Sequence, residues 1–337
     1  MKERNMISKL FLMALVVILV TASSYSQLND NWKWLNPSPQ GNTLSNVDFV
    51  NNNTGYAAGD YGTLLKTTDG GAIWNQISSG TGKDLLSLNF INENTGFVGG
   101  SRQLLRKTTD GGNSWQNLQL PVQGQWDTAY YVMDINFVTQ NTGYVVGFFQ
   151  LESKIWKTTD GGNTWSIQGI GGADYLKRTY FLDENNGFAF GGPAYSEVIK
   201  TTNGGAHWFS VSQESYIAYS MSFINSTTGV YGCAEGRVYR TTDGGNTWNF
   251  AMCPSSLDIT SIHFINSTTG FGFGSGSVYI KTTDAGLTWN EYSIGVGSVN
   301  QYFDADVTAN GNLHAVGTYG AMIRSTNSGT SFISQPF

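Results

Sequence analysis

Charged residues are scarce in this chain of 337 residues. Lys, Arg, Asp and Glu together make up 12% of it, about half the usual share, whereas aromatic residues make up 14%. Few charges combined with many aromatics argue against disorder, and too few charges are present to cover long exposed helices. Proline is rare as well, and the 42 glycines follow no three-residue period, which excludes collagen. The composition therefore predicts an all-β protein built from short strands and glycine turns.

Cysteine and net positive charge are also lacking. With Cys233 and Cys253 as its only cysteines, the chain cannot form a disulfide scaffold and must depend on a packed core. The net charge of −6 disfavours nucleic acid or an anionic membrane as the main partner. The sequence contains no H-E-x-x-H, C-x-x-C or G-x-S-x-G motif. We therefore predict no metal site, no cofactor and no catalytic residue.

Long apolar runs are absent except near the N-terminus. Residues 1–26 begin with basic residues, continue through an apolar stretch from Leu10 to Val20 and end in the small-residue pattern Ser24-Tyr25-Ser26. This order is typical of a cleavable secretory signal peptide. It predicts a secreted or periplasmic protein with no membrane span after cleavage. An uncleaved membrane anchor is the alternative, although the apolar run is short for one.

A nine-residue motif recurs seven times along the chain. The first copy is KTTDGGAIW from Lys66 to Trp74, and successive copies start 40 to 50 residues apart. The fourth position is always Asp or Asn, at Asp69, Asp110, Asp160, Asn203, Asp243, Asp284 and Asn327. Each unit has room for four short strands, which is the size of a propeller blade. The repeat predicts a seven-bladed β-propeller with four antiparallel strands per blade.

We predict that one propeller occupies residues 44–337. The expected blades are 44–80, 81–120, 121–169, 170–213, 214–255, 256–296 and 297–337. The preceding segment, 27–43, contains Trp32 and Trp34 and resembles a fourth strand without its blade. It either pairs where the ring closes or remains outside, because the last blade already has a fourth strand of its own.

The motif itself has a structural interpretation. Its Asp or Asn side chain can accept hydrogen bonds from the following backbone N–H groups, closing the turn between the third and fourth strands. The glycines adopt positive φ at little cost, and the final Trp packs between neighbouring sheets. The seven Asp or Asn residues are therefore predicted to be structural and not catalytic.

The pattern S/T-x-D/N-x-G-x-S/T-W/F resembles the Asp-box, or bacterial neuraminidase repeat. Its longer form, with N-T-G-aromatic followed by L-x-K-T-T-D-G-G-x-x-W, resembles the photosystem II stability/assembly factor family of seven-bladed propellers over about residues 31–337. That resemblance implies a chaperone-like, non-enzymatic factor that binds protein through a basic patch. This chain departs from the family in being acidic and poor in arginine.

Three functions are compatible with these features. The first is an exported, monomeric protein without enzymatic activity that acts as a protein-binding scaffold or as an assembly and stability factor. The second is a carbohydrate-binding, glycoside-hydrolase or sialidase-like propeller, since Asp-box propellers also occur in sialidases and xyloglucanases. The third is a structural surface module with no specific ligand.

Polar residues on the innermost strands form one group of candidate site residues. They alternate with apolar residues, which predicts that they face the central channel. The titratable ones are Asp48, Asp134, Asp304, Asp306 and His263. They form either a solvated channel lining or a site for a small ligand or cation, and two carboxylates across a cleft would suit a glycosidase.

Aromatic residues in the longer loops of blades three and four form a second group. The predicted partner-binding residues are Trp126, Tyr130, Tyr131, Phe148, Phe149, Tyr175, Arg178 and Tyr195. Exposed together on the loop-rich face, they would suit a peptide or a glycan; alternatively they cap the core. Cys233 and Cys253 end the second and fourth strands of blade five near the same rim. They either form a disulfide or stay apart, because the strand between them implies a separation of about 9 to 10 Å.

Overall fold

The computed structural model describes residues 41–121, 130–150, 152–192, 196–296 and 301–335. The predicted signal peptide, the segment 27–40, Trp126 and Tyr195 lie outside the described residues. Within the described ranges, no helix has the length and apolar character needed to cross a membrane.

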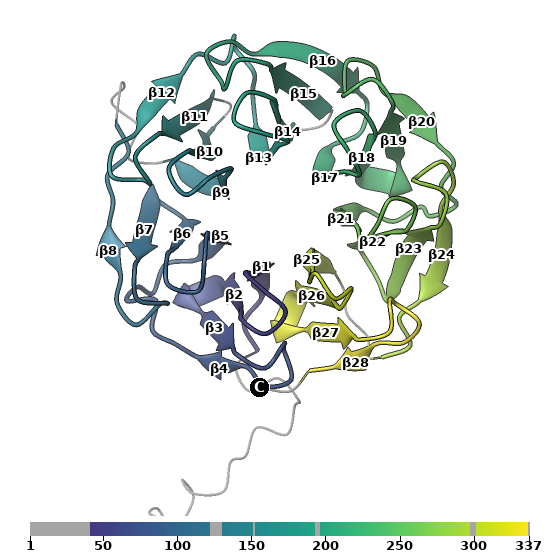
Figure 1. Ribbon diagram of the computed structural model, residues 1–337, viewed down its shortest axis with the longest axis horizontal. Helices are drawn as coiled ribbons and strands as arrows, with labels where there is room; N and C mark the ends of the chain where they lie inside the picture. Colours follow the sequence, from purple (N-terminus) through teal and green to yellow (C-terminus); the bar gives the residue numbers. More distant parts are fainter. Residues whose placement is uncertain (1–40, 122–129, 151, 193–195, 297–300, 336–337) are drawn as a thin grey trace, which may run out of the picture.

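The described residues form seven sheets of four strands each, arranged radially around a central axis (Figure 1). Within every sheet the strands follow one another in chain order and pair antiparallel. The prediction of a seven-bladed, four-stranded β-propeller is therefore confirmed.

Each blade contributes one strand to the inner wall of the ring. These inner strands are β1 (Leu44–Phe49), β5 (Leu85–Phe90), β9 (Tyr131–Phe137), β13 (Leu176–Phe181), β17 (Ala218–Phe223), β21 (Ile259–Phe264) and β25 (Tyr302–Val307). The second strands are β2 (Gly55–Gly59), β6 (Gly96–Gly100), β10 (Gly143–Phe149), β14 (Gly187–Gly191), β18 (Gly229–Cys233), β22 (Gly270–Gly274) and β26 (Leu313–Gly317). Most of the second strands are buried along their whole length, because another blade covers each of their faces.

The two outer strands of each blade flank the repeated motif. The third strands are β3 (Leu64–Thr67), β7 (Leu104–Thr108), β11 (Glu152–Thr158), β15 (Ser196–Thr201), β19 (Val238–Thr241), β23 (Val278–Thr282) and β27 (Met322–Ser325). The fourth strands are β4 (Asn75–Gln76), β8 (Gln116–Asn117), β12 (Ser166–Gln168), β16 (Phe209–Glu214), β20 (Asn249–Ala251), β24 (Asn290–Ser293) and β28 (Ile333–Ser334). Short 3₁₀ turns follow three second strands: η1 (Asp60–Gly62), η3 (Ala234–Gly236) and η4 (Thr318–Gly320).

The hydrophobic core is divided among the junctions between blades. One cluster packs Tyr56 and Leu64 of the first blade against Leu88 and Phe90 of the second. The other junctions hold equivalent clusters. A single blade therefore could not bury its apolar faces alone, and the ring is the unit that is stabilised.

The repeated Asp or Asn lies at the turn between the third and fourth strands. In the third blade, Asp160 Oδ1 accepts hydrogen bonds from the backbone N–H groups of Asn163 and Thr164, at 3.0 and 2.9 Å. Its other carboxylate oxygen accepts the Thr164 hydroxyl at 2.6 Å. Comparable bonds form at Asp69, Asp110, Asn203, Asp243, Asp284 and Asn327. All seven side chains are occupied in closing their own turns.

In blades one to six, the basic residue that opens the motif links the blade to the next one. Lys66 Nζ donates to the carbonyl of Gly111 in the following motif at 2.9 Å, and it lies over the Tyr56 ring at 5.2 Å. Lys107, Lys157, Lys200, Arg240 and Lys281 donate to the next motif in the same way. These bonds hold the blades together at the end of the channel where the motif turns lie.

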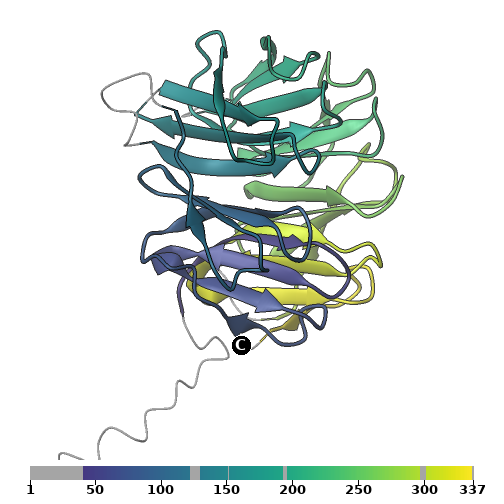
Figure 2. The same ribbon diagram turned by 60° about the vertical axis from the view of Figure 1, so that its left-hand side comes forward.

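Among the described residues, blades seven and one close the ring without exchanging a strand. The last sheet consists of β25 to β28 and the first of β1 to β4, so each contains only consecutive strands. Figures 1 and 2 both show these two blades side by side near the C-terminus. Val316 and Met322 of the last blade pack with Val47, Leu65 and Trp74 of the first.

Candidate functional site at the channel mouth

Polar side chains on the inner strands join neighbouring blades around the channel. At every junction, at least one of them accepts a hydrogen bond from a backbone N–H of the next blade's inner strand. The acceptors are Asn46, Asp48, Asn89, Asp134, Tyr180, Ser220, Ser222, Ser261, Asp304 and Asp306. The channel carboxylates thus serve as cross-links between blades.

Three of these carboxylates gather where blades seven, one and two meet. Asp306 Oδ2 accepts from Phe49 N at 2.6 Å, Asp304 Oδ2 from Val47 N at 3.0 Å, and Asp48 Oδ2 from Phe90 N at 2.6 Å. Burial, followed by the charge of Asp306, raises the pKa of Asp48 to about 8. Burial also raises the pKa of Asp304 to about 6, although Arg178 and His263 oppose the shift. Asp48 and Asp304 therefore bind protons more strongly than free carboxylates do.

Each inner strand contains a β-bulge near the end where it begins. In β1, Leu44 pairs with Gly59 and Asn46 with Ala58, so Ser45 is the extra residue between them. The same shift occurs once in each of the other six inner strands. The seven extra residues are Ser45, Leu86, Met133, Lys177, Tyr219, Thr260 and Phe303, which we call the bulge ring. A bulge turns a side chain away from the direction that regular alternation would give it.

The bulge explains a glycine at the end of the second strand. A Cβ atom on Gly59 would lie 2.0 Å from the carbonyl oxygen of Thr43, two residues before the bulge. Gly317 faces the equivalent carbonyl of Gln301 at 2.1 Å. In these two blades the backbones of the first and second strands are thus too close for a side chain, whereas blade five carries Cys233 at this position.

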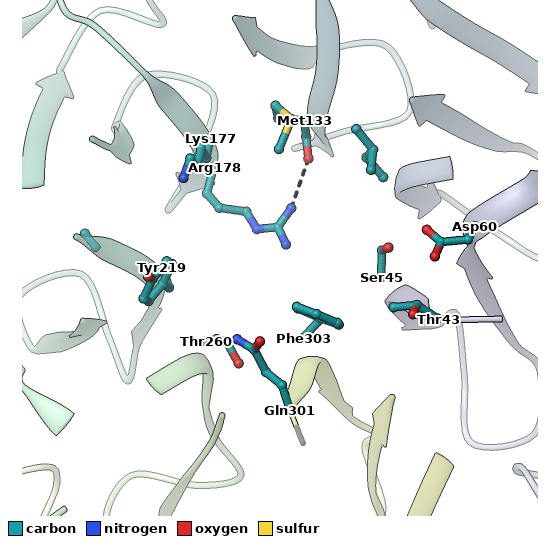
Figure 3. A pocket seen from close by; sticks show the side chains of 12 residues that line it. Thr43, Ser45, Asp60, Met133, Lys177, Arg178, Tyr219, Thr260, Gln301 and Phe303 are labelled. Atoms are coloured by element: carbon teal, nitrogen blue, oxygen red, sulfur yellow. Dashed lines mark hydrogen bonds between the residues drawn. The ribbon is translucent and has the colours of Figure 1, made fainter. Parts of the chain in front are cut away.

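All seven members of the bulge ring line one cavity of about 510 Å³ at the mouth of the channel. Its other lining residues are Thr43, Asp60, Arg178, Ala218 and Gln301 (Figure 3). Cavities of this size commonly hold small molecules or side chains of a partner. Every blade contributes to the wall, so the cavity exists only in the closed ring.

The charged groups of the cavity lie on opposite sides. Figure 3 shows Lys177 and Arg178 on one side and Asp60 on the other. Arg178 Nη1 donates to the Met133 carbonyl at 2.9 Å and lies 4.0 Å from Asp134 Oδ1. Burial and the neighbouring Arg178 lower the pKa of Lys177, while burial and Asp84 raise that of Asp60. In both residues burial disfavours the charged form, although a hydrogen bond with Thr43 partly opposes the shift at Asp60.

The predicted aromatic surface is only partly exposed. Tyr131, Phe148 and Tyr175 form a chain of rings across blades three and four, with centroids 6.2 and 4.7 Å apart. Tyr131 is exposed, whereas Phe148, Phe149 and Tyr175 are half-buried. Tyr130 requires a correction: its side chain is 1% exposed and packs edge-on against Trp156, so it caps the core and cannot contact a partner.

The polar channel residues singled out from the sequence lie on the inner strands, whereas the sequence analysis did not identify the bulge ring. Strict alternation puts a residue such as Lys177 on the side away from the channel, and one inserted residue reverses that. The glycine at the end of the second strand was the available signal, since it marks close backbone approach.

The remaining candidates occupy separate places. Cys233 is buried and Cys253 half-buried, and both are free cysteines in the structure. His263 Nε2 lies 3.1 Å from Ser261 Oγ on the channel wall. Across the described ranges, no group of three or more His, Cys, Asp or Glu side chains is arranged to hold a metal ion.

Sequence comparison identifies the family of this propeller. The family described as Photosynthesis system II assembly factor YCF48 matches residues 25–124 and 122–256. The chain belongs to this family. No curated protein matches it.

Solved structures of YCF48 have the same fold. One, described as YCF48 bound to D1 peptide, is 17% identical with a TM-score of 0.69, and the match covers 88% of this chain and 96% of that one. YCF48 from Cyanidioschyzon merolae is 16% identical with a TM-score of 0.68, covering 85% and 96% of the two chains. An ancestral GH74 enzyme is 15% identical with a TM-score of 0.68, and the match covers 90% of this chain but 47% of the enzyme.

Proposed function

We propose that this YCF48-family protein is a non-enzymatic assembly or stability factor that holds a segment of a client protein at the channel mouth. The observation that carries the proposal is the cavity walled by all seven blades, whose bulge residues point into open space. A site formed only by the complete ring suits a rigid scaffold that presents one binding surface.

Two further observations support a protein ligand. The cavity combines apolar side chains, among them Leu86, Met133 and Phe303, with a few charged groups, which is the usual make-up of a peptide-binding pocket. A YCF48 structure, related to this chain in fold, is described as bound to a D1 peptide. The rings of Tyr131, Phe148 and Tyr175, of which Tyr131 is exposed and the other two are half-buried, would extend the contact surface over blades three and four.

Site-specific photo-cross-linking in the native host tests this function. A photoreactive amino acid replaces Tyr219 in the cavity, and the control carries it at Leu287, an exposed residue in a motif turn at the other end of the channel. We expect a discrete client segment, identified by mass spectrometry, to be cross-linked from position 219 and not from 287. Equal products from both positions, or none from 219, would contradict the proposal.

We also propose that residues 1–26 direct export to the periplasm or the exterior. The proposal is supported by the order of basic, apolar and small residues in this segment. N-terminal sequencing of the protein from its native compartment should begin at Gln27. A chain that retains Met1 and stays in the cytoplasm would contradict it.

A carbohydrate-binding or glycoside-hydrolysing function is the second candidate, favoured by the fold likeness to GH74 enzymes and by the channel carboxylates. It predicts glycan binding or hydrolysis that is lost in Asp134→Asn or Asp304→Asn. If the protein neither binds nor hydrolyses any glycan in a broad panel, that result would favour the protein-binding function instead.

A further inference from the structure

The internal repeat allows the seven blades to be compared with one another at equivalent positions. The residue before each bulge is apolar and buried in all seven blades: Leu44, Leu85, Val132, Leu176, Ala218, Ile259 and Tyr302. This position is uniform because it is enclosed in the packed core of every blade, where only an apolar side chain fits.

The bulge ring shows the opposite behaviour. Its seven members are seven different residue types, ranging from Ser45 and Thr260 to Lys177 and Phe303. Six of them are half-buried at the cavity, while Thr260 is buried and donates its hydroxyl to the Tyr302 carbonyl. The scaffold accepts polar, cationic, aliphatic and aromatic side chains at the same backbone position. The fold therefore does not restrict the residue type at the bulge position.

We propose that the bulge ring is the specificity-determining surface of this protein and that it selects an extended client segment with an apolar side chain beside an acidic one. The inference rests on the proposed function and adds the chemistry of the ligand. The apolar side chain enters between Leu86, Met133, Tyr219 and Phe303, and the acidic one meets Lys177 and Arg178.

Charge in the cavity supports this choice of partner. The Lys177 side chain forms no hydrogen bond or ion pair with any residue that the structure describes, and its ammonium group is partly removed from water. Arg178 is already engaged with Met133 and Asp134 through one end of its guanidinium group. An incoming carboxylate would compensate the lysine and complete the arginine's hydrogen bonds.

Asp60 supplies a carboxylate on the side of the cavity opposite the basic residues. It lies on the far side of the cavity from Lys177, beside Asp84, whose carboxylate accepts the Tyr61 N–H at 2.9 Å. No ion pair from a described basic residue reaches either of these carboxylates. A basic residue at the other end of the client segment would therefore strengthen binding.

Fluorescent peptides provide the test. Three peptides share one apolar core and carry Glu, Gln or Lys at one end; a fourth carries Glu at one end and Lys at the other. We expect the Glu peptide to bind the full chain about tenfold or more tightly than the Gln peptide. The doubly charged peptide should bind more tightly still.

Bulge variants assign the effect to its residues. Lys177→Met places in blade four the residue that blade three carries at Met133, so we expect an unchanged melting temperature and loss of the Glu preference. Lys83→Met, which removes an exposed lysine outside the cavity, should leave the preference intact. Asp60→Asn should remove only the gain from the terminal Lys.

The possible outcomes separate the two proposals. A Glu preference that survives in Lys177→Met, or peptides that bind equally regardless of charge, would overturn the inference even when Tyr219 cross-links a client. An absence of both peptide binding and a client cross-link would overturn the proposed function as well.

Discussion

At the scale of single residues, aspartate plays two different structural roles in this protein. In the motif turns the carboxylate is exposed and accepts several hydrogen bonds from its own turn. On the inner strands it is enclosed, lies near other carboxylates and accepts a backbone N–H from the next blade. The two environments shift the carboxyl pKa in opposite directions, so their contributions to stability depend on pH with opposite sign.

Asp160→Asn tests the exposed role. Hydrogen bonds from the Thr164 hydroxyl and N–H lower the pKa of Asp160 to about 2. Its contribution to stability is therefore present above the unfolded pKa of about 4 and is lost as the pH falls through about 2. Denaturant unfolding should show a loss of no more than about 1 kcal/mol at neutral pH, because the group is solvent-exposed. A difference between variant and wild type that grows on acidification would contradict this assignment.

Asp48→Asn tests the enclosed role. Because the pKa of Asp48 is raised to about 8, the folded state holds the proton more tightly than the unfolded chain does. The stability this provides is complete below about pH 4 and is lost as the pH rises through about 8. Asparagine still accepts the Phe90 N–H and cannot ionise. We expect the variant to exceed the wild type by about 1 kcal/mol or more at pH 9, and the two to converge below about pH 4.

The convergence at low pH is the internal control for this measurement. A wild type that becomes more stable than Asp48→Asn as the pH rises would show that Asp48 is held ionised. Asp306→Asn at the neighbouring junction reports whether the effect belongs to one residue or to the cluster.

At the scale of elements, the β-bulge positions the candidate site. It turns one residue of each inner strand toward the cavity. In blades one and seven it also brings the backbones so close that the adjoining second strand carries a glycine, whereas blade five carries Cys233 at that position. The strands themselves were predictable, since each repeat has its own turns and alternation. The bulge was not, because one extra residue in six leaves the apolar pattern of a short strand almost unchanged.

Gly59→Ala tests the bulge geometry. The new Cβ would lie 2.0 Å from the Thr43 carbonyl oxygen, so the two backbones must move apart. We expect a loss of about 2 kcal/mol or more in the free energy of unfolding, measured by denaturant titration. Gly82→Ala is the matched control, because its Cβ would have no neighbour within 4 Å. Equal stability of the two variants would show that the second strand is not tightly held against the bulge.

At the scale of the whole molecule, the ring closes by the inner-strand hydrogen bonds and the apolar packing that also join the other pairs of blades. Asp304 and Asp306 bond to the backbone of β1, and Asn46 and Asp48 bond to β5 in the same way. Each junction also has its own apolar cluster. The position of the chain ends is therefore not essential to the fold.

A circular permutant tests this equivalence. New ends are placed between the exposed residues Gly82 and Lys83, and Gln335 is joined to Gly41 by a linker as long as the connection from β24 to β25. We expect a folded ring whose melting temperature lies within a few degrees of the wild type and whose peptide binding is retained. A permutant that melts far lower would show that the junction of blades seven and one has a special role.

The sequence by itself determined the number of blades, the order of the strands and the role of the motif aspartates. It could do so because each repeat closes its own turn with residues two to four positions apart. Only the tertiary structure decided what the channel carboxylates and bulge residues do. The backbone N–H that each carboxylate accepts from the neighbouring blade lies about 42 to 45 residues away or at the opposite end of the chain. The cavity likewise takes one side chain from each blade's bulge, so it appears only when the ring is closed.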